Sequence, residues 1–205
     1  KAEAEYNKVL GMEDASSATL QGQVYLKLMQ LYADTGRTDE AVKTLMACMK
    51  TDTLATPTEP IQSFLDLKPS AEQIDKLTEL LRGRVAAALQ APSATATGDA
   101  FQLELVKLLM KQGKLQEALQ EARVYYYVCP DLQFMNAINL VASVFKTIDG
   151  NLGRANRFLR FVRFGPAGED GKAGTADDLT NPLAEIPAIA VEQRNALYNQ
   201  VLASQ

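Results

Sequence analysis

Histidine and tryptophan are absent from this chain of 205 residues, and cysteine occurs only at Cys48 and Cys129. Without histidine, the sequence excludes Ser-His-Asp and Cys-His catalysis, zinc sites with histidine ligands and a histidine pH switch. Both cysteines come late in predicted amphipathic helices, beside apolar neighbours, where a cysteine behaves as a small hydrophobe. We therefore expect buried thiols, with a disulfide as the alternative, and two cysteines identify no redox compartment.

Long apolar runs are missing too, since none approaches the ~20 residues of a membrane-spanning helix. The net charge is −4, which disfavours a cationic nucleic-acid binder. The sequence contains no P-loop, no dinucleotide-binding fingerprint and no Gly-x-Ser-x-Gly motif, and no recognisable motif pairs two carboxylates for catalysis. We therefore expect a protein that is not an enzyme and has no membrane span.

What the chain does contain is a recurring turn motif, a glycine followed five residues later by an alanine. It occurs at Gly36–Ala41, Gly113–Ala118 and Gly150–Ala155. Glycine adopts the positive φ that ends a helix, and alanine lets the next helix approach closely. The first two glycines lie 77 residues apart and the last two lie 37 apart. A divergent helix pair over 60–68 and 70–90 is therefore expected to occupy the longer interval.

Apolar residues at helical spacing predict an all-α chain with seven long helices, and no stretch is a convincing strand, although 124–129 is the most strand-like. Residues 2–12 are expected to form a helix with no N-cap before it, so either the first half of a hairpin or a processed leader is expected upstream. Ser70 and Gln73 form a capping-box pattern at the start of one helix. The expected organisation is a helical domain over 1–164 with hairpins near 19–50, 60–90, 99–128 and 132–164, then a Gly/Asp-rich loop over 165–183 and a capping helix of the same domain within 184–205.

Three of these hairpins share a pattern of aromatic, large, glycine, alanine and small residues. Its members are Tyr25, Leu28, Tyr32, Gly36, Ala41, Leu45 and Cys48 in the first hairpin, Leu105, Gly113, Ala118 and Pro130 in the next clear one, and Ala142, Gly150, Ala155, Leu159 and Val162 in the last. With these residues the chain resembles the tetratricopeptide repeat (TPR) family. It departs from the family pattern at Gln102, where an aromatic is usual, and at Tyr125, where a small residue is usual. The resemblance implies an α-α superhelix whose groove binds peptides or protein surfaces without catalysis. The family's peptide-carboxylate clamp cannot be placed here, so no ligand class carries over.

The leading hypothesis is a non-catalytic scaffold that binds a protein or peptide through the face lined by the first helix of each hairpin. Tyr127, which ends a run of three tyrosines, is expected to point away from the core while Tyr125 and Tyr126 pack inside. Packing alone is the alternative interpretation of that run. The groove candidates are the expected solvent-facing positions Gln23, Lys27, Gln30, Gln102 and Asn139, with Tyr127 as a further surface residue.

A second hypothesis concerns the acidic loop within 168–178, which resembles Asp/Gly-rich calcium loops of bacterial extracellular proteins. Calcium prefers six to eight oxygen ligands, and glycines let a short loop surround the ion. The possible calcium ligands are Asp170, Asp177 and Asp178, with Glu169 less certain, and a plain polar loop is the alternative. The chain begins with Lys1 rather than methionine, so a segment upstream is expected. A calcium-stabilised extracytoplasmic structural or attachment module, secreted or periplasmic, is therefore the rival function.

A third hypothesis rests on four arginines at every third position of one predicted helix, interleaved with Phe158, Phe161 and Phe164. Ala155, Leu159 and Val162 are expected to face the core with Phe158 beside them. The arginines could hold phosphates while aromatics stack on the bases of single-stranded RNA. They could equally dock the acidic loop, and the acidic net charge makes nucleic acid an unlikely partner. The candidate anion-binding residues are Arg154, Arg157, Arg160 and Arg163.

Overall fold

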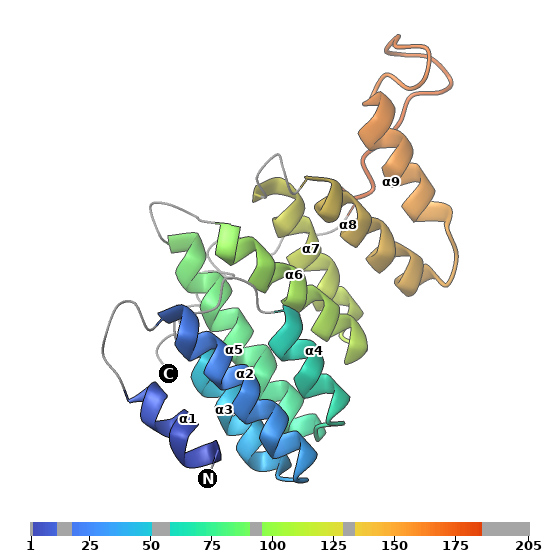
Figure 1. Cartoon of the computed structure of the whole chain (residues 1–205). Helices are drawn as coiled ribbons and strands as arrows, with labels where there is room; N and C mark the ends of the chain where they lie inside the picture. Colours follow the sequence, from blue (N-terminus) through green and yellow to red (C-terminus); the bar gives the residue numbers. More distant parts are fainter. Residues whose placement is uncertain (1, 12–17, 51–57, 91–95, 129–133, 186–205) are drawn as a thin grey trace. The chain divides into compact units, whose positions relative to one another are not determined.

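The computed structural model describes residues 2–11, 18–50, 58–90, 96–128 and 134–185 of the chain (Figure 1). Within these ranges the protein is all-α, with nine helices and no strand, which confirms the expected fold class. None of these helices combines the length and the apolar character that crossing a membrane requires. The helices are α1 (Ala2–Leu10), α2 (Ala18–Asp34), α3 (Thr38–Lys50), α4 (Thr58–Asp66), α5 (Ala71–Gln90), α6 (Ala96–Lys111), α7 (Leu115–Val128), α8 (Phe134–Asp149) and α9 (Gly153–Phe164).

The chain divides into two compact units, the first ending at Glu104 and the second beginning at Leu105, so that the boundary falls within α6. In the first unit α1 packs on α2, α2 on α3, and α4 on both α2 and α3, while α5 packs on α3. In the second unit α8 packs between α7 and α9. The largest buried side chains include Leu28, Leu45, Ile61, Phe64, Leu77 and Leu81 in the first unit, and Tyr125, Phe145 and Phe158 in the second.

The turn glycines have the backbone conformation that the sequence predicts. Gly36, Gly113 and Gly150 all have positive φ, between 64° and 72°. After Gly36 the amide of Arg37 donates to the carbonyl of Tyr32 at 2.8 Å, which is the bond that closes a Schellman turn. The alanine five residues after each of these glycines is buried. The glycine therefore ends one helix and the alanine lets the next one pack closely.

The turn between α4 and α5 forms without a glycine. Lys68 takes the left-handed conformation there, with φ of 52°, and is the one non-glycine residue in the described ranges that does so. Pro69 follows it and has no N–H, so the closing bond seen after Gly36 cannot form. Ser70 and Gln73 then exchange backbone–side-chain hydrogen bonds of 2.9 and 3.3 Å, which confirms the capping box. Along the sequence, Lys68 is closer to Gly36 than to Gly113, so the turns are unevenly spaced along the chain.

One expectation is wrong, two are confirmed, and others fall outside the described residues. Leu159 is 39% exposed, because α9 turns Ala155 and Phe158 inward against α8 and Tyr126 instead. The strand-like stretch at 124–129 is helical as far as Val128. Cys48 is buried, and this burial raises the pKa of its thiol to about 12, so the thiol stays protonated at neutral pH. Cys129, Pro130 and the expected capping helix lie outside the described residues.

A cluster of polar side chains holds α1 on the first hairpin. Arg37 donates to Glu3 at 2.9 Å, the hydroxyl of Tyr32 donates to the same carboxylate at 2.9 Å, and the guanidinium of Arg37 lies 4.5 Å from the centre of the Tyr32 ring. The hydrogen bond from Arg37, followed by that from Tyr32, holds the pKa of Glu3 below its usual value of 4.5.

We expect acid to loosen α1. Because the folded-state pKa of Glu3 is depressed, its contribution to stability is present above pH 4.5 and is lost as the pH falls through the folded-state value. The ring signals of Tyr32 in NMR spectra should therefore change at acid pH. Glu3→Gln should abolish that change, whereas Glu5→Gln on the same helix should leave it intact. An acid transition that persists in Glu3→Gln would contradict the assignment.

Candidate functional site

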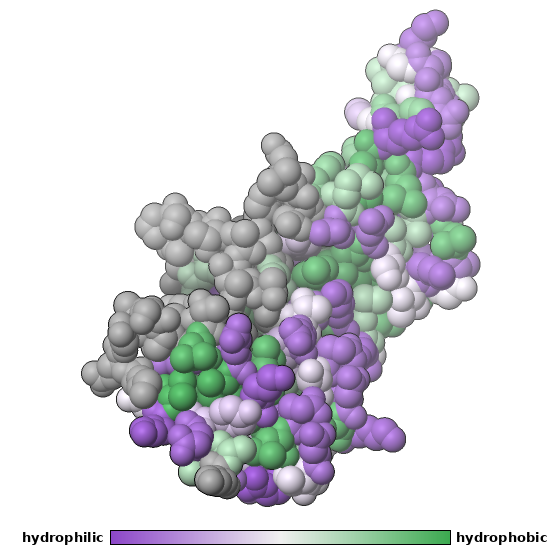
Figure 2. Space-filling model, in the orientation of Figure 1, coloured by the Kyte–Doolittle hydropathy of each residue, from purple (hydrophilic) through white to green (hydrophobic). Residues whose placement is uncertain are grey.

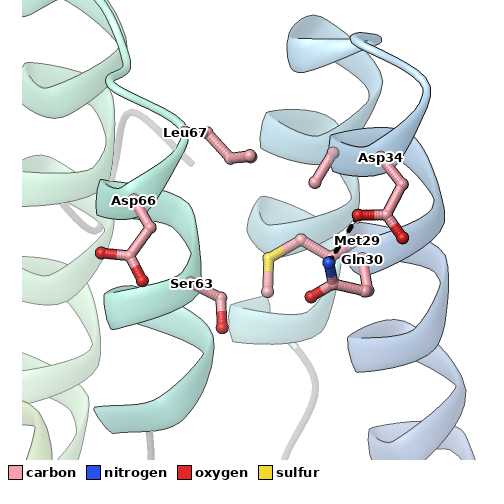
Figure 3. A pocket seen from close by; sticks show the side chains of 7 residues that line it. Met29, Gln30, Asp34, Ser63, Asp66 and Leu67 are labelled. Carbon is pink, nitrogen blue, oxygen red and sulfur yellow. Dashed lines mark hydrogen bonds between the residues drawn. The ribbon is translucent and has the colours of Figure 1, made fainter.

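The exposed face of α2 carries three of the expected groove residues. Gln23, Lys27 and Gln30 are all exposed, and their spacing of four and three residues places them on one side of the helix. Gln30 also lines a hollow of about 310 Å³ between α2 and α4 (Figure 3). The hollow is lined by Met29, Gln30, Ala33 and Asp34 from α2, by Ser63 and Asp66 from α4, and by Leu67 just after α4.

The two helices hold their carboxylates in the same way. The side-chain amide of Gln30 donates to Asp34 at 2.8 Å, and that of Gln62 donates to Asp66 at 2.7 Å. Each pair is separated by four residues, so it spans one helical turn and orients an exposed aspartate. No basic side chain belongs to the described lining of the hollow, whereas two aspartates do. The hollow is therefore a negatively charged recess.

Apolar residues also belong to the lining of this recess, Met29 and Leu67 among them. Met29 is only 3% exposed and belongs to the core of the first unit, yet it lines the hollow. Figure 3 shows Met29 and Ser63 between the two aspartates. The wall of the recess that α4 forms is held in place by two features of that helix. Phe64 is fully buried, and the hydroxyl of Thr58 donates a hydrogen bond of 3.0 Å to Glu104. The recess thus combines an apolar contact surface with charged sides.

A second hollow of about 440 Å³ lies between α3 and α5. It carries charges of both signs, and the side chain of Gln73 donates to Asp39 across it at 3.0 Å. Because its acidic and basic groups offset each other, this hollow has less charge selectivity than the first. It is lined by Asp39, Val42, Lys43, Met46, Ala47, Gln73 and Lys76.

Two other groove candidates have different outcomes. Asn139 is exposed on α8. Gln102 is only 2% exposed, so its expected place on a solvent-facing surface is wrong. The reason is that α6 is buried on more than one face. Helical spacing of apolar residues identifies one buried face and does not reveal a second one. The buried side chains of α6 include Phe101, Leu105, Val106, Leu108 and Leu109.

The three tyrosines of α7 are arranged as expected. Tyr125 is buried, Tyr126 is partly buried and Tyr127 is 58% exposed. The ring of Tyr126 lies 5.1 to 5.4 Å from the rings of Tyr127, Phe134 and Phe158, so it connects α7 with α8 and α9. The hydroxyl of Tyr127 accepts a hydrogen bond of 3.4 Å from Asn181. Tyr127 therefore also anchors the segment after α9.

The acidic loop is closed by its own hydrogen bonds. The amides of Glu169 and Asp170 donate to Asp177 at 2.8 and 3.1 Å, and the amide of Gly174 donates to Asp178 at 2.8 Å. The hydroxyl of Thr175 donates to Asp177 at 2.7 Å, and this bond is the main reason that the pKa of Asp177 is lowered. In the described part of the chain, no three His, Cys, Asp or Glu side chains are grouped to hold a metal ion.

The arginines of α9 are largely engaged within the second unit. Arg154 pairs with Asp149, with Nε lying 2.8 Å from a carboxylate oxygen, Arg157 pairs with Glu185 at 3.4 Å, and Arg160 pairs with Glu169 at 3.1 Å. The guanidinium of Arg163 lies 4.8 Å from the centre of the Phe164 ring. Hydrophilic side chains cover most of the visible surface of α9 and the loop after it (Figure 2). Carboxylates thus neutralise much of the positive charge that phosphate binding would need.

No family model, curated protein or solved structure matches this chain. The resemblance to TPR proteins therefore stays a prediction from the residues. The recess between α2 and α4 is the feature that sequence reasoning located only in part, because it identified Gln30 and missed both aspartates. The signal that could have found them is the recurrence of a Gln-x-x-x-Asp pattern at 30–34 and 62–66.

Proposed function

We propose that this chain is a non-catalytic scaffold that binds a peptide or a protein segment along the exposed face of α2 and the recess between α2 and α4. The observation that carries the proposal is that recess, whose lining joins apolar residues such as Met29 and Leu67 to polar side chains of both α2 and α4. Peptide-binding surfaces typically combine apolar contacts with a few oriented polar groups. If the hairpins are TPR-like, α2 and α4 are consecutive first helices, and the family places its groove on these helices.

Selection of a random linear-peptide display library on the full chain tests this proposal. We expect enriched peptides to protect α2 and α4 from hydrogen exchange. The triple variant Gln23→Ala, Lys27→Ala, Gln30→Ala should weaken their binding about tenfold, as removal of central contacts commonly does. The matched triple variant Lys43→Ala, Gln73→Ala, Lys76→Ala in the other hollow should change it less than about twofold. Protection confined to α3 and α5, or a library with no enriched peptide, would contradict the proposal.

Two other functions stay predictions from the sequence. Calcium binding by the 165–183 loop would raise the Tm in millimolar Ca²⁺ relative to EDTA, and Asp177→Asn would abolish that rise. Single-stranded RNA binding by α9 would give a gel shift that weakens with salt. The ion pairs of Arg157 and Arg160 with carboxylates argue against the RNA function, because phosphates would have to displace them.

A further inference from the structure

The recess between α2 and α4 has a charge character that points to one kind of occupant. Asp34 and Asp66 lie on different walls, and both carboxylates are exposed to solvent. Lys27 and Lys68 are near in the sequence, but neither of them lines the recess. The lining therefore holds two negative charges, and the described residues offer no positive charge within it to offset them.

Gln30 and Gln62 orient these two carboxylates, so that each can accept a further hydrogen bond from a bound molecule. Gln30 and Gln62 each donate to the Oδ1 atom of their aspartate, which leaves Oδ2 outside those two bonds. A carboxylate that is already oriented loses less side-chain freedom when it accepts a further hydrogen bond. The hydroxyl of Ser63 adds an acceptor between the two aspartates, and Met29 and Leu67 offer an apolar surface.

We propose that this recess binds the cationic side chain, lysine or arginine, of a bound peptide. The inference rests on the proposed function, because it names the residue class that the same groove prefers. Lysine and arginine carry an aliphatic stem beneath a charged head, and the lining offers apolar atoms of Met29 and Leu67 beside two aspartates. Exposed ion pairs are individually weak, so the recess sets the preference at one peptide position and the rest of the groove supplies most of the affinity.

The probes that test this are four peptides, Ac-Ala-Leu-X-Leu-Ala-NH₂, in which X is arginine, lysine, citrulline or glutamate. Citrulline keeps the shape of arginine and removes its charge. Binding to the full chain is followed through the methyl signal of Met29, assigned with Met29→Leu, while the other five methionines serve as internal references. We expect the arginine and lysine peptides to bind about fivefold or more tightly than the citrulline peptide, and the difference to shrink with salt.

The double variant Asp34→Asn, Asp66→Asn removes the charges and still accepts the bonds from Gln30 and Gln62. In this variant the arginine peptide should bind no better than citrulline does. The control Asp39→Asn, Glu40→Gln changes the net charge equally at the start of α3 and should keep the preference. Equal binding of all four peptides would overturn the charge preference and leave peptide binding intact. If the methyl signal of Met29 does not change when any of the four peptides is added, the inference is overturned. The library selection tests the proposed function separately.

Discussion

Replacing Phe64 by alanine is expected to lower the free energy of unfolding by about 3–5 kcal/mol and to remove the recess between α2 and α4. Phe64 is fully buried and belongs to a helix of nine residues that also buries Pro60 and Ile61. A helix this short is not stable in water by itself, so its place depends on these buried contacts. Without Phe64, the wall that carries Ser63 and Asp66 should separate from α2.

Chemical denaturation and the methyl signal of Met29 together check this prediction. Because the chain has two compact units, the transition should be followed with signals from the first unit as well as with total helicity. Leu65→Ala is the matched control, since Leu65 is the next residue of the same helix and is only partly buried. A Phe64→Ala variant as stable as Leu65→Ala, with an unchanged Met29 signal, would show that α4 is held by other contacts.

Replacing Gly168 by alanine is expected to open the acidic loop. Gly168 has φ of 66°, and a Cβ atom there would lie 2.3 Å from the carbonyl oxygen of Asp177 and 2.6 Å from its Oδ2 atom. The first of these contacts is with backbone, so a side-chain rotation cannot relieve it. The loop must move apart, and the amides of Glu169 and Asp170 should then lose their bonds to Asp177.

Hydrogen exchange at the amides of Glu169 and Asp170 measures this opening. We expect exchange to quicken about tenfold or more, which corresponds to the loss of roughly one hydrogen bond. Gly171→Ala is the control, because Gly171 has a similar φ of 68° but a Cβ atom there would meet nothing within 4 Å. The control shares the backbone strain and lacks the clash. Equal exchange in the two variants would mean that strain, and not close approach to Asp177, governs the loop.

Local chemistry made much of the fold predictable. The apolar spacing of α2, α7 and α8 and the glycines at 36, 113 and 150 act within a few residues, so they can be interpreted without knowing what packs against them. The turn at Lys68 escaped the same reasoning, because a lysine carries no signal for positive φ. Its conformation follows from the packing of α4 and α5 on α3, together with a proline that cannot continue the helix.

The sequence by itself determined which segments are helices, where most of them turn, and that no histidine chemistry takes place. The tertiary structure decided which polar residues are available. It buried Gln102, engaged Arg157 and Arg160 with carboxylates, and placed Asp34 beside a recess that Asp66 shares. The physical reason is that helical periodicity depends on neighbours along the chain. Burial and charge pairing depend on neighbours in space, and these come from helices that the sequence alone does not bring together.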